Sequence, residues 1–326
     1  MSDIVNYYSS FESAQEYEAQ GDILSAAKEF WLCYQYYEHG DFPLGTDQSL
    51  GFKACEKFKK LQNKLPYARL SKTNYLKGCQ CLKALWLYKN RYDARFVSEE
   101  QKQKFKVGHI IGDLAKKLFA GGKDASFFMQ ALFLKSLQAK TPLEVPSLPY
   151  RIKQNLWLKR TRTLMNNRVK DIYEAAFTYN DIFAAVDILE FNDERVVAFE
   201  VKSSFDVRDV YIQDSALQYY VISHNVHLDD FFLVYPDEEY IESQGLKIEA
   251  LTVYNCDVEK LFKKKSILDA VKSLQPSVEQ HLKEIKSVLA SGNMPSAPVD
   301  DHCSYPYECE FLRYCKNSLD WEFTIY

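Results

Sequence analysis

The pattern of apolar and polar residues divides the chain into a helical first half and a second part in which strands begin near Ile172. Apolar residues recur every three or four positions in residues 11–38 and 49–62, as on one face of a helix. Residues 70–90 are expected to form a loop that leads into a helix, and residues 99–120 a further helix. This change of period along the chain predicts an α/β protein.

Three runs rich in β-branched and aromatic residues follow, with the sequences IYEAAFTY, IFAAVDILEF and VVAFEVKSS. Turn-forming residues separate them, Asn180-Asp181 first and residues 192–195 second. We therefore expect an antiparallel meander. The remaining expected elements are a helix over 209–223, strands over 230–235 and 246–254, helices within 257–291 and a loop-like tail after Pro295.

The first two helices are similar to one tetratricopeptide-type hairpin, because small and aromatic residues flank a turn at Gly21-Asp22. Such arrays need about three units to bury their faces, and no second clear copy follows. Two interpretations stay open, a helical extension packed on the main domain and a module that docks a protein partner. The expected domains are residues 1–66, the helical extension, and residues 67–326, the main domain.

Length and composition are those of a folded chain. At roughly 150 residues per domain, 326 residues allow about two domains, and 47% hydrophobic with 26% charged residues excludes disorder. The longest apolar stretches, such as residues 231–235, are far shorter than the roughly 20 residues of a membrane-spanning helix. The N-terminus lacks the basic and apolar regions of a signal peptide. The expected location is cytoplasmic, with no membrane association.

A net charge of −4 means that any nucleic-acid binding has to come from a local basic patch. Residues 151–170 contain seven basic residues and no acidic one, with Trp157 among them. Two interpretations stay open for this segment. It either follows a phosphate backbone and stacks a base, or it is a helix whose charges only solvate it. The residues expected to bind nucleic acid are Lys159, Arg160, Arg162 and Arg168.

Three acidic residues, Glu174, Asp187 and Glu200, recur at intervals of thirteen. If Asn180-Asp181 is a two-residue turn, the numbers of paired residues add up to 361, and Glu174 lies opposite Asp187. A tight turn within residues 191–196 gives a sum of 387 and places Asp187 opposite Glu200. Opposed side chains on paired strands are about 5 Å apart, and like charges there are destabilising. Cations are therefore expected beside the row.

Lys202 lies two residues beyond Glu200, hence on the same face of the strand, and supplies one positive charge. A divalent cation with oxygen ligands, Mg²⁺ or Mn²⁺, is expected to supply the rest. A solvated hairpin surface is the alternative interpretation. Apolar residues on both faces of these strands argue against it, because buried charge needs a partner.

Asp187 followed by Glu200-Val201-Lys202 on the next strand resembles the P-D-(D/E)-x-K nuclease core. Residues 172–222 resemble RecB-type nucleases, the branch that includes CRISPR-associated and helicase-linked iron-sulfur nucleases, and an uncharacterised bacterial family with the same residue order. The resemblance implies a restriction-endonuclease-like core, a mixed sheet flanked by helices. It also implies hydrolysis of DNA phosphodiester bonds with Mg²⁺ or Mn²⁺, in an exonuclease-like mode.

The resemblance also implies roles for single residues. Asp187 and Glu200 bind the metal together with the carbonyl of Val201, and Glu174 is an additional acidic ligand. Lys202 orients and activates the attacking water. A glutamine on the following helix, Gln218, steadies the site.

The sequence departs from the family pattern where a metal-binding histidine is expected. Gly112 occupies that position, and His109, one helical turn earlier, is the candidate substitute. This departure supports a second hypothesis, a catalytically degenerate nucleic-acid-binding scaffold that recruits a partner through residues 1–66. A third, a pure interaction protein, rests on the helical hairpin alone.

Cysteines gather near the C-terminus in a C-x5-C-x5-C motif formed by Cys303, Cys309 and Cys315. Without a signal peptide, thiols or metal ligands are expected rather than disulfides. Cys81, in CQCLKALWL, resembles the first cluster cysteine of the iron-sulfur nucleases, which implies a [4Fe-4S] cluster that holds the C-terminal tail to the domain. A structural zinc site is the alternative. Cys79 in place of Cys81, and His302 as a further ligand, also stay open.

Overall fold

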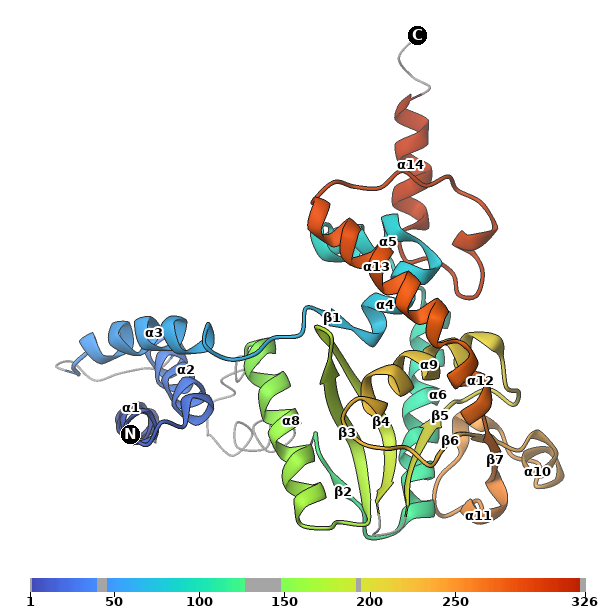
Figure 1. Cartoon of the computed structure of the whole chain (residues 1–326), viewed down its shortest axis with the longest axis horizontal. Helices are drawn as coiled ribbons and strands as arrows, with labels where there is room; N and C mark the ends of the chain where they lie inside the picture. Colours follow the sequence, from blue (N-terminus) through green and yellow to red (C-terminus); the bar gives the residue numbers. More distant parts are fainter. Residues whose placement is uncertain (1, 40–45, 127–147, 192–194, 323–326) are drawn as a thin grey trace. The chain divides into compact units, whose positions relative to one another are not determined.

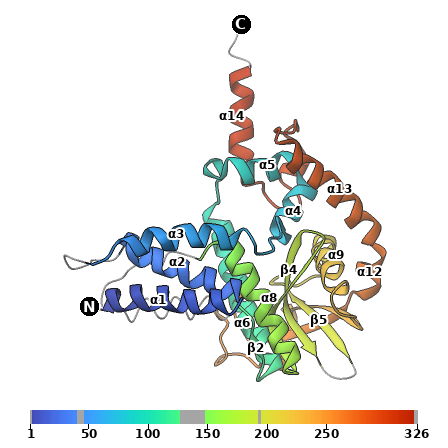
Figure 2. The same cartoon turned by 60° about the vertical axis from the view of Figure 1, so that its left-hand side comes forward.

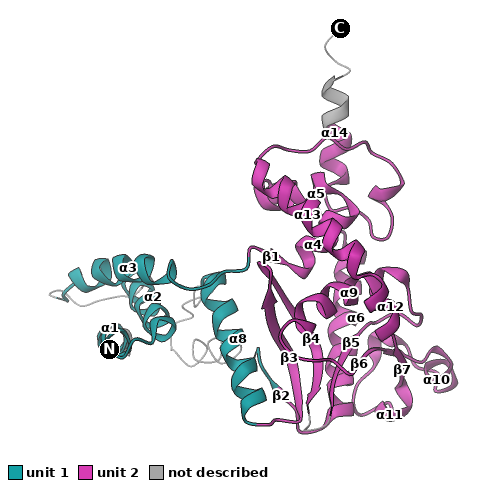
Figure 3. Ribbon diagram, viewed as in Figure 1, with its two compact units in different colours: residues 1–68, 124–167 teal, residues 69–123, 168–326 magenta. Residues whose placement is uncertain are grey.

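The computed structural model describes residues 2–39, 46–126, 148–191 and 195–322 (Figure 1). The chain forms two compact units (Figure 3). Unit 1 comprises Met1–Ala68 and Asp124–Asn167, and unit 2 comprises Arg69–Lys123 and Arg168–Tyr326. The first boundary falls close to residue 66, but unit 1 also takes in residues 124–167, which the sequence had assigned to the main domain. The reason lies in the packing of a helix from that segment.

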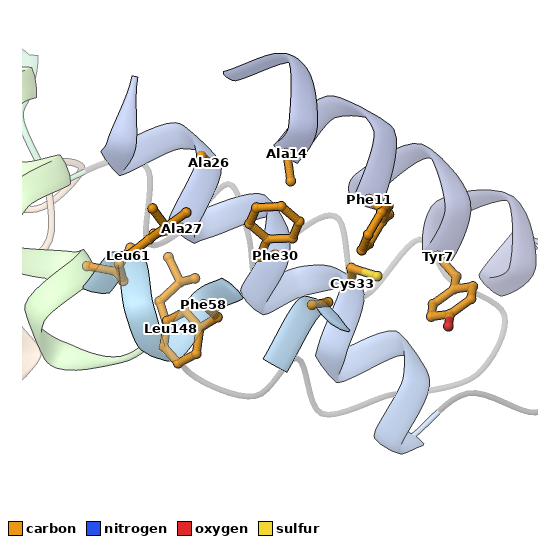
Figure 4. Close-up of a cluster of buried hydrophobic side chains, with 12 residues drawn as sticks. Tyr7, Phe11, Ala14, Ala26, Ala27, Phe30, Cys33, Phe58, Leu61 and Leu148 are labelled. Carbon is orange, nitrogen blue, oxygen red and sulfur yellow. The ribbon is translucent and has the colours of Figure 1, made fainter. Parts of the chain in front are cut away.

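Unit 1 is built from α1 (Ser2–Ala19), α2 (Ile23–His39), α3 (Ser49–Gln62) and α8 (Tyr150–Asn166). The expected hairpin and third helix are confirmed, and Gly21 adopts a positive φ of 77° in the turn between α1 and α2. Phe11, Phe30 and Phe58 share one core with Ile152 of α8 (Figure 4 shows the three phenylalanines). A single hairpin cannot bury its apolar face, so α3 and α8 cover it.

Unit 2 is organised around an open, mixed sheet of seven strands in the order β2-β3-β4-β5-β6-β7, with β1 paired beside β4. The β1–β4 and β5–β6 pairs are parallel, and the β3–β4, β4–β5 and β6–β7 pairs are antiparallel. The expected α/β class with a mixed sheet flanked by helices is confirmed. The strands are β1 (Leu70–Ser71), β2 (Lys123–Asp124), β3 (Asp171–Tyr179), β4 (Ile182–Phe191), β5 (Val196–Val201), β6 (Asp230–Pro236) and β7 (Phe262–Ser266).

Both predicted registers are confirmed. Tyr179 pairs with Ile182 across the first turn, and Ile188 pairs with Phe199 across the second hairpin. Asn180 and Asp181 have φ values of 49° and 65°, the left-handed conformation that a two-residue hairpin turn of this type requires. Asn and Asp adopt this conformation more readily than other residues with a side chain, so local chemistry sets the register.

Helices cover both faces of the sheet (Figures 1 and 2). On one face, α6 (Glu99–Ala115) and the short η2 (Lys116–Phe119) pack apolar side chains, including Ile111, against Ile188 and Phe199. On the other face, α9 (Asp209–Ser223) lies across β3 and β4 and is covered in turn by α12 (Leu268–Ser273) and α13 (Gln275–Ser291).

Two expected elements after β6, in residues 246–254 and 257–291, were wrong. Residues 246–254 contain the short η3 (Ile248–Ala250) and no strand, whereas β7 lies within residues 257–291, which were expected to be helical. Its sequence, FKKKS, has one apolar side chain and no strand pattern. Pairing with the edge of β6 makes it a strand, and charged residues on an edge strand discourage pairing with other molecules.

The segment 70–90 forms two helices instead of one, α4 (Lys72–Gln80) and α5 (Leu82–Asn90), with extended backbone at Cys81 between them. The remaining helices are η1 (Tyr92–Ala94), α10 (Glu238–Ser243), α11 (Val258–Leu261), η4 (Asp301–Cys303) and α14 (Leu312–Glu322). Among the described residues, no helix is both long and apolar enough to cross a membrane.

Candidate active site

The candidate site lies where β4 and β5 separate. Their ladder ends at the pair Ile188 and Phe199, and β1 pairs with β4 only at Ile182 and Phe183. In the fork between these two ladders, the backbone N–H of Val201 donates a 2.6 Å hydrogen bond to Asp187 Oδ2 instead of continuing the sheet. The carboxylate of Asp187 therefore lies between two ladders whose ends are fixed by secondary structure.

Glu200 is the most enclosed acid of the site, with 2% of its surface exposed. Its Oε1 accepts hydrogen bonds from Lys202 Nζ at 2.7 Å and from Lys72 Nζ at 2.9 Å. Its Oε2 accepts one from Gln218 Nε2 at 2.7 Å. The same amide nitrogen donates to the carbonyl of Ala185 at 2.8 Å, so Gln218 ties α9 to both β4 and β5.

Lys72 and Asp214 belong to this cluster but were missed by the sequence reasoning. Lys202 Nζ donates to Asp214 Oδ2 at 2.5 Å, and Lys72 Nζ lies 3.5 Å from the same oxygen. Two ammonium groups thus bridge two carboxylates. Asp214 lies four residues before Gln218, on the same face of α9, which is a signal that the sequence contains. The sequence contains no such signal for Lys72, because only the pairing of β1 with β4 brings this residue to Glu200.

Glu174 keeps its expected register on β3, but its carboxylate forms an ion pair with a lysine outside the acidic row. Its neighbours Tyr173 and Ala175 pair with Ile188 and Val186, as a sum of 361 requires. Glu174 itself has a φ of 53°, and its Oε1 lies 3.2 Å from Lys116 Nζ. It acts on Asp187 electrostatically, as one of the charges that raise the pKa of that residue.

The carboxyl groups in the fork differ in their protonation. Burial, and then the charge of Glu200, raise the pKa of Asp187 to about 8 against the opposing effect of Lys72. Burial also acts to raise the pKa of Glu200, but Lys202 and Lys72 outweigh it and hold that pKa well below its usual range. Without a bound cation, Asp187 is therefore largely protonated at neutral pH, whereas Glu200 is ionised.

The ammonium group of Lys202 stays charged. Burial lowers its pKa, but Asp214 and Glu200 outweigh this effect and hold the pKa well above its ordinary value. The fully ionised cluster has four carboxylates and three ammonium groups. The carboxylates are those of Glu174, Asp187, Glu200 and Asp214, and the ammonium groups are those of Lys72, Lys116 and Lys202. One negative charge remains uncompensated, and it falls on Asp187.

The oxygen atoms of the fork suit a hard divalent cation. Asp187 and Glu200 would hold it, and two buried oxygens beside them, Asp214 Oδ1 and Gln218 Oε1, have no hydrogen-bond partner in the described structure. His109 is exposed on α6, and among the described residues no hydrogen bond or ion pair joins it to these carboxylates. Within the described ranges, no three or more His, Cys, Asp or Glu side chains form a group that could hold a metal ion.

The four predicted cluster cysteines come from distant parts of unit 2 and are neighbours in the structure. The thiol of Cys309 interacts electrostatically with those of Cys81, Cys303 and Cys315, and the thiol of Cys315 with those of Cys81 and Cys303. Burial, reinforced by these neighbours, raises the pKa of Cys309. Four converging thiols are the donor set of an iron-sulfur cluster or a zinc site, although they do not close to metal-binding geometry.

The two alternative ligands are placed differently. Burial raises the pKa of Cys79, a hydrogen bond with Tyr75 lowers it, and the charge of Glu284 raises it. His302 Nε2 lies 3.7 Å from the sulfur of Cys303, its sequence neighbour. Cys81 is therefore the N-terminal cysteine that the fold brings to the C-terminal motif.

The tail is also held by polar contacts that do not involve sulfur. Glu310 accepts hydrogen bonds from Lys77 at 2.5 Å and from Arg95 at 2.8 Å. Gln80 Nε2 donates to the carbonyls of His302 and Tyr307 at 2.8 and 2.7 Å. These contacts fasten residues 302–310 to α4 and the segment after α5.

The basic segment is divided between the two units. In unit 1, Lys159 forms an ion pair with Asp22 at 3.2 Å, whereas Arg160 and Arg162 are exposed on α8. Arg168 is exposed in unit 2. Part of the positive charge thus stabilises unit 1, and the two exposed arginines of α8 carry what remains of the predicted nucleic-acid surface there.

Fold and site together define an α/β protein with an open mixed sheet and a buried cluster of carboxylates and lysines at the fork of two strands. No protein-family profile and no curated protein matches the sequence. The crystal structure of SSO0001 is similar at 10% sequence identity, with a TM-score of 0.26, over 64% of this chain and 95% of that one. A likeness at this level carries no argument about fold or function.

Proposed function

We propose that the chain is a Mg²⁺- or Mn²⁺-dependent DNA nuclease with a restriction-endonuclease-like core. The observation that carries the proposal is the convergence of four side chains at one fork of the sheet, those of Asp187, Glu200, Lys202 and Gln218. Glu200 accepts hydrogen bonds from Lys202 and Gln218, and Asp187 accepts one from the backbone of Val201. Hydrolysis of a phosphodiester needs neutralisation of charge and an aligned water more than covalent chemistry. This arrangement offers both.

Each residue has a task that follows from its contacts. A cation held by Asp187 and Glu200 would neutralise the phosphate and lower the pKa of a bound water. Lys202, which stays protonated between Glu200 and Asp214, is a hydrogen-bond donor that orients the water and stabilises charge on the phosphate. Gln218 fixes the carboxylate of Glu200, and Lys116 balances Glu174 at the edge of the fork.

The test is cleavage of end-labelled single- and double-stranded DNA by anaerobically purified protein with Mg²⁺ or Mn²⁺. Lys202→Ala is expected to reduce the rate at least about 100-fold, because it removes the donor to the reacting groups. Lys265→Ala, at an exposed position of β7, is the matched control and should cut as the wild type does. Metal-independent cutting, or equal rates in a folded Lys202→Ala protein, would contradict the proposal, and the product ladder separates end-directed from internal cleavage.

One observation favours the second candidate, a catalytically degenerate DNA-binding scaffold. Lys72 places an ammonium group 2.9 Å from Glu200 Oε1, where it already supplies positive charge to the carboxylate that would hold the metal. Divalent-metal affinity that disappears in Asp187→Ala supports the enzyme. DNA binding that is indifferent to metal and to this substitution supports the scaffold, whose partner would dock on residues 1–66.

We further propose that Cys81, Cys303, Cys309 and Cys315 hold a structural [4Fe-4S] cluster, with zinc as the alternative. When present, it would join both ends of unit 2 covalently, in addition to the contacts of Glu310. Cys81→Ser is expected to abolish the brown absorbance of anaerobically purified protein and to lower its melting temperature. Cys79→Ser should retain both, and a colourless wild type that contains zinc would show the site to be a zinc site.

A further inference from the structure

Two lysines share the same carboxylate oxygens in the fork. Lys202 Nζ lies 2.7 Å from Glu200 Oε1 and 2.5 Å from Asp214 Oδ2. Lys72 Nζ lies 2.9 Å and 3.5 Å from these two oxygens. Two like charges this close to each other repel. The ammonium group with the longer contacts, that of Lys72, is therefore the more weakly held.

The exposure of the two lysines differs in the same sense. The side chain of Lys72 keeps 29% of its surface exposed, against 15% for Lys202. Lys202 Nζ also lies 5.4 Å from the centre of the Tyr211 ring, and the backbone N–H of Lys202 donates to the carbonyl of Val234 at 2.9 Å. Lys202 is therefore enclosed, whereas Lys72 borders solvent.

The backbone that carries Lys72 is fixed on both sides. Leu70 and Ser71 form β1, which pairs with β4. Ser71 is also the N-cap of α4, because its side chain accepts a 3.3 Å hydrogen bond from the N–H of Asn74. The ammonium group of Lys72 can thus leave the fork by rotation of its side chain, without unfolding α4 or changing the register of β1.

The charges of the fork indicate what would make it leave. Apart from the ion pair of Glu174 with Lys116, the fork holds three carboxylates and two ammonium groups, those of Asp187, Glu200 and Asp214 and those of Lys72 and Lys202. With all of them ionised, three negative and two positive charges leave a net charge of −1. A divalent cation would change it to +1 with Lys72 in place and to 0 with Lys72 turned away. An excess charge is costly where Glu200 is 2% exposed, so neutrality favours the exchange of Lys72 for the metal.

We propose that Lys72 is an internal competitor of the divalent cation, an ammonium group that occupies the oxygens of Glu200 and Asp214 until the metal displaces it into solvent. The inference deepens the proposed nuclease function and rests on it for the presence of a metal at Asp187 and Glu200. It assigns the control of metal affinity to a lysine that the proposed chemistry leaves unused.

The test is calorimetric titration of Mn²⁺ into the anaerobically purified, full-length protein. Lys72→Met is expected to bind Mn²⁺ at least about tenfold more tightly than the wild type, because the competing charge is gone. Lys72→Arg keeps the charge and should gain no affinity. Lys265→Met, the same charge change at an exposed position of β7, is the control and should bind as the wild type does. Unchanged or weaker binding by a folded Lys72→Met protein would overturn the inference.

A second measurement uses the wild type alone. Acetylation of lysines by an N-hydroxysuccinimide ester, followed by peptide mass spectrometry, reports which amines reach solvent. Lys72 should react several-fold faster in Mn²⁺ than in EDTA, whereas exposed Lys265 should react equally in both. Equal rates at Lys72 in the two solutions would contradict its displacement by the metal.

The outcomes separate this inference from the nuclease proposal. If Lys72→Met binds Mn²⁺ more tightly but neither protein cleaves DNA, the inference stands and the nuclease proposal fails. If the wild type cleaves with Mn²⁺ while Lys72→Met gains no affinity, the nuclease proposal stands and the inference fails. Absence of Mn²⁺ binding in both proteins refutes both.

Discussion

Asp187→Asn is expected to reduce Mn²⁺-dependent cleavage at least about 1000-fold and to abolish Mn²⁺ binding measured by calorimetry. The asparagine retains an oxygen that can accept the N–H of Val201, so the fork keeps its shape. It lacks the charge that a divalent cation needs, and Glu200 alone cannot replace it because two ammonium groups already occupy its Oε1. Loss of cleavage without loss of fold therefore reports on the metal.

The pH dependence of the same variant has a defined direction. An aspartate has a pKa of about 3.9 in an unfolded chain, and burial raises that of Asp187 to about 8. Between these values the folded protein binds more protons than the unfolded chain. The stability that the protonation of Asp187 contributes is therefore fully present below about pH 4 and is lost as the pH rises through about 8. Asp187→Asn removes this loss. The free energy of unfolding of the variant should therefore fall less between about pH 5 and pH 8 than that of the wild type, as measured by urea denaturation at the two pH values.

A bound metal competes with the same proton. Mn²⁺ affinity of the wild type is expected to rise about tenfold per pH unit up to about pH 8 and then level off. Glu190→Gln, which makes the same charge change near the far end of β4, is the control and should leave cleavage and metal affinity unchanged. Full metal affinity in Asp187→Asn would contradict the assignment of Asp187 as a ligand.

Glu200→Ala is expected to destabilise unit 2 by about 3–5 kcal/mol, whether or not the protein is a nuclease. The substitution leaves the ammonium groups of Lys72 and Lys202 with one shared carboxylate, Asp214, in a setting where Glu200 is 2% exposed. It also deprives the amide of Gln218 of one acceptor. Urea unfolding followed by circular dichroism measures the loss.

A double-mutant cycle separates the charge from the packing. The double variant Glu200→Ala, Lys72→Met should recover part of the stability that Glu200→Ala loses. The reason is that the second substitution removes an ammonium group that the first one leaves without its carboxylate. Glu200→Gln, which keeps the volume, should cost less than Glu200→Ala. Strictly additive losses in the double variant would show that Lys72 and Glu200 do not interact in solution.

The meander is the part of the fold that could be predicted in most detail. Asn180 and Asp181 adopt the left-handed conformation of a two-residue turn, and the strand period of two then fixes which side chains share a face. The same reasoning located Asp187 opposite Glu200 and placed Lys202 beside them. The helix expected at about 209–223 is α9, Asp209–Ser223.

The sequence by itself determined elements whose causes are local: tight turns, strand alternation, helical period and the spacing of the acidic row. The tertiary structure alone decided which distant segments meet. Lys72 reaches Glu200 only through the parallel pairing of β1 with β4, and FKKKS is a strand only because β6 offers an edge. Likewise the break between α4 and α5, which leaves Cys81 in extended backbone, was not predicted from the sequence. Such contacts close loops of about thirty residues between β6 and β7 and of more than a hundred residues for Lys72 and Cys81, and they leave no periodic signal in the chain.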